Sequence, residues 1–351
     1  MAQRRIVAAL MGDGRIGLVE QDVPELRPGA VLVQVHASLV SPGTELGGWR
    51  GLKAKIDNPN PDAEPRPFGY QNAGVVLQVG EGVEEFKPGD RVACMGGGYA
   101  MHTNYAVVPH NLCVALPDTV TFAQGAYNHL AATALMALRR GTTQFGEYVA
   151  VLGLGVVGQL TAMLHQLAGR FVIGWDMIPM RNEVAEGWGI DATLLVGQED
   201  EVEVTKEFTR GYGLDASVIA FGGNADKALE TVTRCMKLSP DGHHMGTIVV
   251  VGGAHFHCPA VTTNLDIRRS SRTGPGYHDE PWEYGPAYPP VFMRWTTRTN
   301  LELCIRLISE GRMDVDCLTT HTIKLQDAEA GIADIMQDPD GILGVIFEMS
   351  H

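Results

Sequence analysis

A glycine-rich loop between an apolar segment and a helix-like segment is the first feature of this chain that is suited to bind a ligand. Glycines at 153, 155 and 158 follow the apolar segment Tyr148–Leu152 directly, and apolar residues then recur at helical spacing over 159–168. The first glycine permits a tight turn, the second lets the backbone approach a pyrophosphate, and the third lets helix and strand pack closely. The helix N-terminus offers its N–H groups to phosphates. The pattern predicts a dinucleotide site.

An acidic residue ends the second predicted strand of this region. Asp176 lies 18 residues after Gly158 and follows the apolar segment Phe171–Trp175. A carboxylate there accepts hydrogen bonds from ribose hydroxyls and repels the additional phosphate of NADP. We therefore expect NAD, with NADP as the less favoured alternative because Arg181 is able to pair with that phosphate. The residues expected to contact the cofactor are Gly153, Gly155, Val156, Val157, Gly158, Asp176, Met177, Arg181, Phe221, Gly222, Gly252 and Thr133.

The elements that must position these residues change in character near residue 122. Before it, short strand-like segments such as Ala73–Val79 alternate with turns that contain Gly and Pro, which is typical of a β-barrel. Helical spacing covers 122–140, and strand-like segments such as 216–220 and 247–251 then alternate with helix-like ones. This alternation predicts a parallel, doubly wound sheet, so the fold class is α/β.

Composition narrows the class of protein further. The 351 residues suffice for two domains, and the net charge of -14 disfavours nucleic acid as a partner. No apolar stretch approaches the ~20 residues of a membrane span. Cysteines without any C-x-x-C pair favour reduced thiols and a cytoplasmic location. The cysteines are Cys94, Cys113, Cys235, Cys258, Cys304 and Cys317.

Several short motifs together resemble the medium-chain dehydrogenase/reductase family over essentially the whole chain. They are KPGDRV at 87–92, YAVVP at 105–109, AATAL at 131–135, VLGLG at 151–155 and LTTH at 318–321.

The resemblance implies a particular domain order and a particular chemistry. It implies a GroES-like β-barrel catalytic domain over 1–130, a Rossmann NAD-binding domain over 131–297, and a return segment over 298–351 that completes the catalytic domain. It also implies hydride transfer with NAD(P). A homodimer or homotetramer is expected, paired near the sheet edge through the strand 247–251.

The chain departs from the zinc-containing members of that family at the ligand positions. Where those members carry C-G-T-D and G-H-E, this chain has PGTE at 42–45 and GYQ at 69–71, and their cluster of four cysteines is absent. Zinc needs about three ligands of Cys, His or carboxylate type. The motif SPGTE at 41–45 resembles a branch of the family without zinc, so no catalytic zinc is expected. A different metal site, built from His129 and Glu45 with His102 or Cys94, stays open as an alternative.

Without zinc, a side chain must take the hydroxyl proton as hydride leaves the carbon. The resemblance places Tyr70 and His129 at former ligand positions, where they would face the nicotinamide, and both are candidates for the proton shuttle. Thr44 and Glu45 are expected to orient the substrate oxygen. Gln71 is expected to hydrogen-bond the substrate or Tyr70.

A long segment rich in aromatic residues, 274–295, is expected to cover the site as a loop. Tyr277, His278 and Trp282 suit stacking on a sugar or ring face, and a role in subunit contact is the alternative.

Together these features predict hydride transfer between nicotinamide and a secondary alcohol or ketone on a small polyhydroxylated or cyclic substrate, without nucleic-acid or membrane partners. A zinc-independent quinone or enone reductase is the alternative enzyme. A non-catalytic NAD-binding protein is the third possibility.

Overall fold

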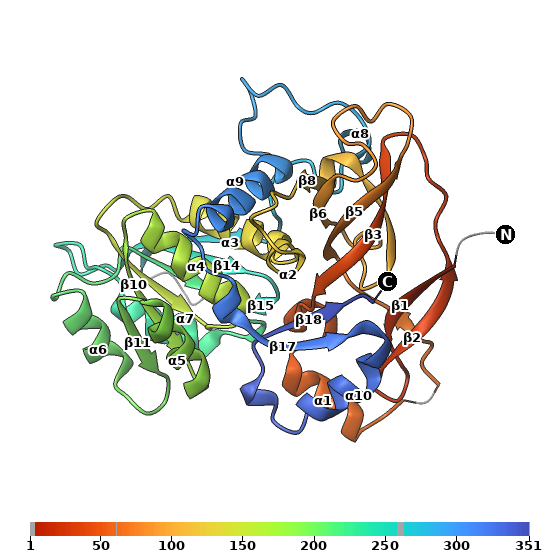
Figure 1. Ribbon diagram of the computed structural model, residues 1–351. Helices are drawn as coiled ribbons and strands as arrows, with labels where there is room; N and C mark the ends of the chain where they lie inside the picture. Colours follow the sequence, from red (N-terminus) through yellow and green to blue (C-terminus); the bar gives the residue numbers. More distant parts are fainter. Residues whose placement is uncertain (1–3, 61, 258–262, 351) are drawn as a thin grey trace. The chain divides into compact units, whose positions relative to one another are not determined.

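Two compact units make up the chain (Figure 1). The computed structural model describes residues 4–60, 62–257 and 263–350, so Cys258 lies outside the described part. The first unit comprises Met1–Ala132 and Thr273–His351, and the second comprises Thr133–Arg272. No helix among the described residues is long and apolar enough to cross a membrane.

The first unit is built on β-sheets, with helices at their margins. Its larger sheet has the order β17-β18-β3-β5-β6-β8, with β7 also paired to β3, and a smaller sheet has the order β2-β1-β4. The strands are β1 (Arg4–Leu10), β2 (Ile16–Asp22), β3 (Ala30–Leu39), β4 (Arg66–Pro67), β5 (Gln71–Val79), β6 (Arg91–Met95), β7 (Tyr105–Pro109), β8 (Cys113–Ala115), β17 (Thr319–Lys324) and β18 (Gly344–Glu348). The helices that belong wholly to this unit are α1 (Trp49–Asp57), α2 (Phe122–Gly125), α8 (Glu280–Glu283), α9 (Thr297–Ser309) and α10 (Ala328–Ile335).

The central strand of the larger sheet joins distant parts of the sequence. β3 pairs antiparallel with β5, β7 and β18, and β18 lies near the end of the chain (Figure 1). Most of the residues of β3 are apolar, and most of its side chains are buried. The first unit therefore depends on residues from both ends of the chain.

The second unit is a parallel sheet flanked by helices. Its strand order is β11-β10-β9-β12-β14-β16, so the first strand, β9, lies between β10 and β12. Its strands are β9 (Tyr148–Leu152), β10 (Phe171–Asp176), β11 (Ala192–Leu195), β12 (Ala216–Ile219), β14 (Met245–Val251) and β16 (Asn264–Ser270), with a small pair, β13 (Gly223–Asn224) and β15 (Ala254–His255). Its helices are α4 (Val156–Leu167), α5 (Pro179–Trp188), α6 (Glu201–Phe208) and α7 (Asp226–Cys235), and α3 (Asn128–Gly141) leads into it. The order of the strands is that of a Rossmann fold, which confirms the predicted α/β class.

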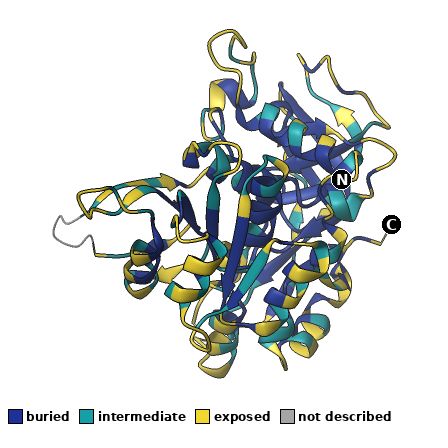
Figure 2. Ribbon diagram, turned by 90° about the vertical axis from the view of Figure 1, so that its left-hand side faces the viewer, coloured by how far each residue is buried: buried dark blue, intermediate teal, exposed yellow. Residues whose placement is uncertain are grey.

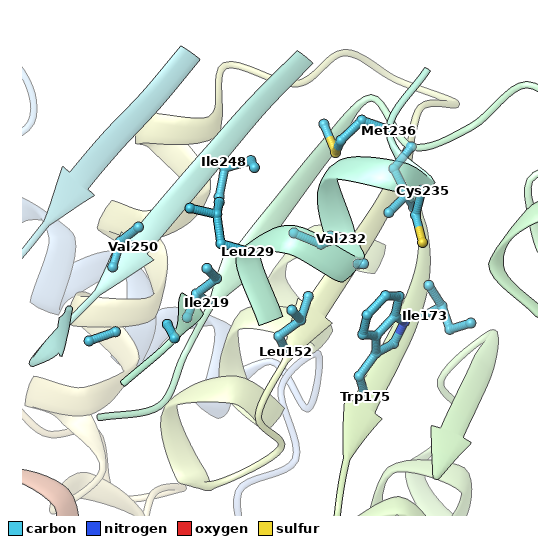
Figure 3. Packing of buried hydrophobic residues seen from close by; sticks show 14 of the residues in the cluster. Leu152, Ile173, Trp175, Ile219, Leu229, Val232, Cys235, Met236, Ile248 and Val250 are labelled. Atoms are coloured by element: carbon cyan, nitrogen blue, oxygen red, sulfur yellow. The ribbon is translucent and has the colours of Figure 1, made fainter. Parts of the chain in front are cut away.

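Aliphatic side chains from the sheet and from α7 form one core of the second unit. Leu152 and Ile219 come from neighbouring strands, and Leu229 and Val232 of α7 lie against the sheet (Figure 3). Figure 2 shows the strands mostly buried and the outer faces of the helices exposed. This arrangement explains why the strands read as continuous apolar runs, since both faces of a parallel sheet are covered.

The structure adds detail to two expectations about the elements. The helical pattern at 122–140 forms two helices, α2 and α3. The strand at 247–251 lies near the edge of the sheet as expected, and the edge strand itself is β16, which pairs with β14 on its outer side.

The structure corrects the expectation about the second domain boundary. The sequence predicts that boundary after residue 297, whereas the structure places 273–297 in the first unit. Hydrogen bonds explain the difference, because the Asn300 side chain donates to the Thr273 carbonyl at 2.7 Å and the Asn111 side chain donates to the Trp282 carbonyl at 2.7 Å. The segment expected to be only a loop also contains the short helix α8.

Candidate active site

The predicted dinucleotide loop has the geometry that a pyrophosphate requires. Gly153 has a φ of +91°, and a Cβ on Gly158 would lie 1.8 Å from the Gly153 carbonyl oxygen, so both positions need glycine. A Cβ on Gly155 would meet nothing within 4 Å, which leaves the backbone open to a ligand. Gly155 precedes α4 and no side chain caps that helix. The helix N-terminus is therefore suited to phosphate.

Asp176 lies at the carboxyl end of β10 and its side chain is largely buried. The carboxylate accepts hydrogen bonds from the backbone N–H groups of Leu154 at 2.7 Å and Ile178 at 2.9 Å. Arg181 is paired with the same carboxylate at 3.4 Å. Two carboxylate oxygens have about four acceptor positions, so Asp176 retains capacity for ribose hydroxyls.

The other predicted cofactor residues lie at or beyond the carboxyl ends of neighbouring strands or on helices. Phe221 follows β12 and packs against Gly153, with Gly222 next to it, and Gly252 follows β14 with a φ of +71°. Met177 follows β10 and is 68% exposed. The remaining three are on helices: Val156 and Val157 begin α4, and Thr133 is half-buried on α3.

The segment that replaces the first zinc motif is a single turn of π-helix, Pro42–Leu46. Such turns often occur at functional sites. Glu45 lies within it and folds back, so that its Oε2 accepts the backbone N–H of Ser41 at 2.7 Å. Thr44 is exposed, whereas Glu45 is only 5% exposed. Thr44 is thus placed to meet a ligand, but the expectation that Glu45 orients the substrate oxygen directly is wrong.

Tyr70 and His129 lie side by side in the first unit. Their ring centroids are 4.4 Å apart, and the His129 Nδ1 is 3.3 Å from the Tyr70 carbonyl oxygen. A carbonyl only accepts, so Nδ1 carries the hydrogen, and the neutral ring has its lone pair on Nε2. Burial lowers the pKa of His129 to about 4, against the opposing effect of the hydrogen bond to the Tyr70 carbonyl. His129 is therefore neutral at neutral pH.

The Tyr70 hydroxyl stays protonated in this site. Burial raises the pKa of Tyr70 above its usual value, and the negative charge of Glu45 raises it further. Hydrogen bonds with the hydroxyls of Ser41 and Thr44 act in the opposite direction on that pKa. The Tyr70 side chain is thus a neutral hydroxyl that can donate a hydrogen bond, not a phenolate.

Gln71 does not have the catalytic role expected from the sequence. Its Nε2 donates to the Leu39 carbonyl at 3.1 Å, and its Oε1 accepts from the Leu130 backbone N–H at 3.2 Å. The side chain is fully buried. Both ends of the amide bind backbone, so Gln71 positions its neighbours.

The aromatic segment contributes two of its three predicted residues to this cluster. Tyr277 and His278 are stacked with centroids 3.8 Å apart, and Tyr277 meets His129 edge-on at 6.1 Å. The Tyr277 hydroxyl accepts the backbone N–H of Gly97 at 2.8 Å. Trp282 is only 2% exposed and packs over Gly276, so the expectation that it stacks on substrate is wrong.

The sequence suggests a role for a further histidine, His102, only as a metal ligand. His102 is fully buried, with its Nε2 3.2 Å from Glu45 Oε2 and its Nδ1 2.8 Å from the Ser38 hydroxyl. Over the described residues, no group of three or more His, Cys, Asp or Glu side chains is arranged to hold a metal ion. Only the pairing of a buried histidine with a buried carboxylate, which sequence spacing does not reveal, brings His102 into the site.

Comparison with known proteins agrees with this geometry. Residues 27–118 match the model of the alcohol dehydrogenase GroES-like domain. Mouse sorbitol dehydrogenase is 29% identical over 269 residues, which cover 69% of this chain and 72% of that protein. The probable D-xylulose reductase A of Aspergillus terreus is 23% identical over 374 residues, covering 95% and 96%. This chain is an oxidoreductase that contains the GroES-like domain of alcohol dehydrogenases and is similar to named dehydrogenases and reductases over most of its length.

The fold of this dehydrogenase/reductase also matches solved structures over its full length. An oxidoreductase/dehydrogenase of unknown specificity from Escherichia coli, involved in membrane biogenesis, superimposes with a TM-score of 0.79 at 19% identity, covering 99% of this chain and 100% of the other. The protein is an oxidoreductase, and the open glycine loop with its uncapped helix fits a nicotinamide dinucleotide.

The zinc of other members does not fit the side chains of this dehydrogenase/reductase. Pro42 offers no donor atom, and a tyrosine whose pKa is raised resists the ionisation that ligation requires. Gln71 is committed to backbone hydrogen bonds.

Trp282→Ala tests the anchoring of the aromatic segment. Because the indole is 2% exposed, its loss is expected to lower the free energy of unfolding by about 3–5 kcal/mol, measured by denaturant titration. Phe292→Ala is the control, since that ring is 87% exposed and its removal should change stability by less than about 0.5 kcal/mol. Equal losses in the two variants would contradict the burial of Trp282.

Proposed function

We propose that this protein is an NAD-dependent dehydrogenase that transfers a hydride between nicotinamide and a secondary alcohol or ketone without a catalytic zinc. The observation that carries the proposal is the pairing of Tyr70 with His129, whose ring centroids are 4.4 Å apart at the positions that hold zinc ligands in other members. Their polar groups replace the metal in handling the hydroxyl proton.

Two routes for this proton follow from the hydrogen bonds. His129 accepts it on Nε2, which the hydrogen bond from Nδ1 to the Tyr70 carbonyl leaves as the acceptor of the neutral ring. Alternatively, the Tyr70 hydroxyl relays it, taking the substrate proton on its oxygen as it gives up its own to water through the exposed Thr44 hydroxyl. A positioned acid or base of this kind contributes about 10²–10⁴-fold to rate.

Support for a polyhydroxylated or cyclic substrate comes from the ring faces of the site and from the relatives. Tyr277 and His278 form a stacked pair next to His129. Aromatic faces pack on the apolar face of a sugar or cyclitol ring, while hydroxyls such as that of Thr44 bind its oxygens. The relatives are named for oxidation of sorbitol and reduction of xylulose.

A panel of polyols, cyclitols, sugars and enones tests the proposal. The formation or loss of reduced cofactor is followed by absorbance with NAD, NADH and their phosphorylated forms, with and without a chelator. We expect turnover of a secondary alcohol or its ketone that the chelator does not change, and well under one zinc per chain by elemental analysis. Exclusive reduction of enones, stoichiometric zinc, or nucleotide binding without any turnover would each overturn the proposal.

Asp176→Ser tests the cofactor preference. We expect the parent protein to bind NAD at least tenfold more tightly than NADP, a difference of about 1.4 kcal/mol, because the carboxylate repels the additional phosphate and already pairs with Arg181. The serine variant should narrow that ratio in a calorimetric titration. Glu183→Gln removes an exposed carboxylate from α5, the helix that carries Arg181, and should leave the ratio unchanged. Equal affinities in the parent would show that Arg181 decides the preference.

Tyr70→Phe and His129→Gln separate the two proton routes. At least one of these variants should lower turnover by about 100-fold or more with NAD affinity within a few-fold of the parent. Burial lowers the pKa of His129 to about 4, so imidazolium forms only below that pH. If His129 is the acceptor, the parent rate falls as pH drops through about 4, not through 6–8 as an unperturbed histidine predicts, and His129→Gln lacks that limb. Near-normal turnover in both variants would exclude both routes.

The edge strand β16 supports a two-fold dimer. β16 is the last strand of its sheet in the described part of the chain, and Ile267 at its centre is 37% exposed. In an antiparallel pairing about Ile267, Asp266 would lie opposite Arg268 of the partner subunit. Opposite charges across strands contribute about 0.2–1 kcal/mol per pair, and like charges destabilise.

A charge exchange at β16 tests this pairing. We expect a dimer or a dimer of dimers for the parent by light scattering at micromolar concentration. Asp266→Arg should weaken the pairing, and the double variant Asp266→Arg/Arg268→Asp should restore it. A monomeric parent, or a double variant as weak as the single one, would show that this edge does not pair in that register.

A further inference from the structure

One residue of the aromatic segment has a backbone conformation that is rare for residues other than glycine. His278 has a φ of +70°, in the left-handed region. The other non-glycine residues with positive φ in the described part of the chain are Thr142 and Arg210, which follow α3 and α6, where a left-handed residue commonly ends a helix. His278 ends no helix. A strained residue of this kind persists only where its surroundings hold it, and such residues cluster at active sites and ligand clamps.

A buried carboxylate holds the backbone of His278 in this conformation. Glu283 is 3% exposed, and its Oε1 accepts the backbone N–H of His278 at 2.8 Å. Its Oε2 accepts the Tyr99 hydroxyl at 3.4 Å. Burying a carboxylate costs free energy unless hydrogen bonds compensate, and one of its two oxygens is used here for a single peptide N–H. Glu283 therefore fixes the backbone at His278.

Two further hydrogen bonds anchor the chain on either side of His278. The Tyr277 hydroxyl accepts the backbone N–H of Gly97 at 2.8 Å. Beyond His278, the Asn111 side chain donates to the Trp282 carbonyl at 2.7 Å. Segments that connect elements are usually more mobile than the elements themselves, but this one is tied to the body of its unit around His278. The position of this histidine is therefore set before any ligand binds.

The imidazole of His278, unlike its backbone, is open to a ligand. The residue is exposed, and its ring stacks on Tyr277 with centroids 3.8 Å apart. Across the described residues, no hydrogen bond joins either nitrogen of the ring to another side chain or to the backbone. Both ring nitrogens of His102 and of His110, in contrast, have partners within the protein. His278 thus presents an open imidazole edge on a fixed backbone.

The His278 ring lies beside the groups proposed to handle the proton. Tyr277, on which it stacks, meets His129 edge-on with centroids 6.1 Å apart, and the His129 and Tyr70 centroids are 4.4 Å apart. The four rings form one continuous series of contacts. A substrate whose reacting hydroxyl meets Tyr70 or His129 reaches His278 with its other carbons when it lies along Tyr277.

We propose that His278 is a specificity-determining residue that hydrogen-bonds a non-reacting hydroxyl of a polyol or cyclitol, and that Glu283 is the positioning residue that fixes it. The inference rests on the proposed function and narrows its substrate class to alcohols with a further hydroxyl beyond the reacting carbon. An imidazole always carries an N–H, and a hydroxyl both donates and accepts, so the two groups are compatible. A site built to hydrogen-bond a substrate hydroxyl discriminates against the analogue that lacks it.

His278→Asn is the first test, because asparagine tolerates a positive φ better than most residues and its short amide does not reach as far as the imidazole. With a cyclitol or polyol from the panel, we expect KM to rise by about five- to tenfold, which corresponds to the loss of one hydrogen bond. Both kcat and NAD affinity should stay within about threefold of the parent.

The control for His278→Asn is a monohydroxy alcohol with the same carbon skeleton, such as cyclohexanol for a cyclitol. It stacks on the same ring but lacks the further hydroxyl, so its KM should stay within about twofold of the parent value. An equal rise in KM for both substrates would show that the ring only stacks. An unchanged KM for both would show that His278 does not touch the substrate, and either result would overturn the proposal.

Glu283→Leu and Glu283→Gln test the positioning role. Leucine removes both hydrogen bonds, and KM for the cyclitol or polyol should rise about as much as in His278→Asn, with kcat nearly unchanged. Glutamine keeps a carbonyl oxygen that accepts the His278 N–H, and should recover most of that loss. Glu280→Gln removes an exposed carboxylate from the same helix, α8, and should match the parent.

A double variant separates positioning from a general structural role of Glu283. In His278→Gly the imidazole is absent and the backbone adopts a positive φ without strain, so adding Glu283→Leu should raise KM no further. A further rise, or equal losses in Glu283→Leu and Glu283→Gln, would overturn the positioning role.

Histidine NMR distinguishes failure of this inference from failure of the proposed function. The Cε1–H signal of His278 is assigned by its absence in His278→Asn, and a cyclitol or polyol added to the complex with NAD should shift it. A shift without turnover of any compound in the panel would support the inference while the proposed function fails. A signal that no cyclitol or polyol of the panel moves would overturn the inference, even where turnover of other secondary alcohols supports the proposed function.

Discussion

One buried amide holds the three segments of the candidate site in place. Gln71 donates to the Leu39 carbonyl at the end of β3 and accepts from the Leu130 N–H near the start of α3. Tyr70 precedes this glutamine, His129 precedes Leu130, and the turn with Thr44 and Glu45 follows β3 closely. Both ends of the amide bind backbone inside the protein, where a lost partner leaves a buried polar group unsatisfied. The spacing of Tyr70, His129 and the turn is therefore set by a residue whose side chain is fully used in holding them.

The features that sequence could predict are those with a local physical cause. Turn geometry predicts the glycine loop, and the spacing of apolar residues predicts the strand before it and the strand that ends at Asp176. The structure has all three at the predicted positions. The roles of Gln71, Glu45 and Trp282 could not be predicted, because burial and hydrogen bonding depend on residues far away in the chain. Gln71 follows Tyr70 in the sequence, so a catalytic role is a reasonable prediction until its hydrogen bonds to backbone are known. For the same reason the sequence does not predict that residues 273–297 belong to the first unit, because hydrogen bonds from Asn111 and Asn300 hold them there.

The protonation states of His129 and Tyr70 follow from their burial and from the polar groups next to them. His129 gains one backbone acceptor but loses water, so its neutral form is favoured, and Tyr70 is kept protonated by burial next to a negative charge. The buried Glu45 is balanced by an N–H of the backbone and by a histidine, not by a lysine or arginine side chain. A metal ion would reverse these tendencies, since a cation favours ionised ligands. The surroundings thus keep both His129 and Tyr70 neutral.

The pairing of β18 with β3 has a consequence for how the chain acquires its structure during synthesis. Residues 133–272 form one continuous stretch, so the second unit can complete its sheet as soon as it has left the ribosome. β3 was made long before, but β18, which pairs with its last residues, 37–39, is translated about 300 residues later. At bacterial or eukaryotic rates of about 5–20 residues per second this is a wait of tens of seconds. Throughout that interval the end of β3 lacks this neighbour and is open to pairing with other nascent chains. The turn with Thr44 and Glu45 follows this strand, so the candidate site is among the last parts of the molecule to be assembled.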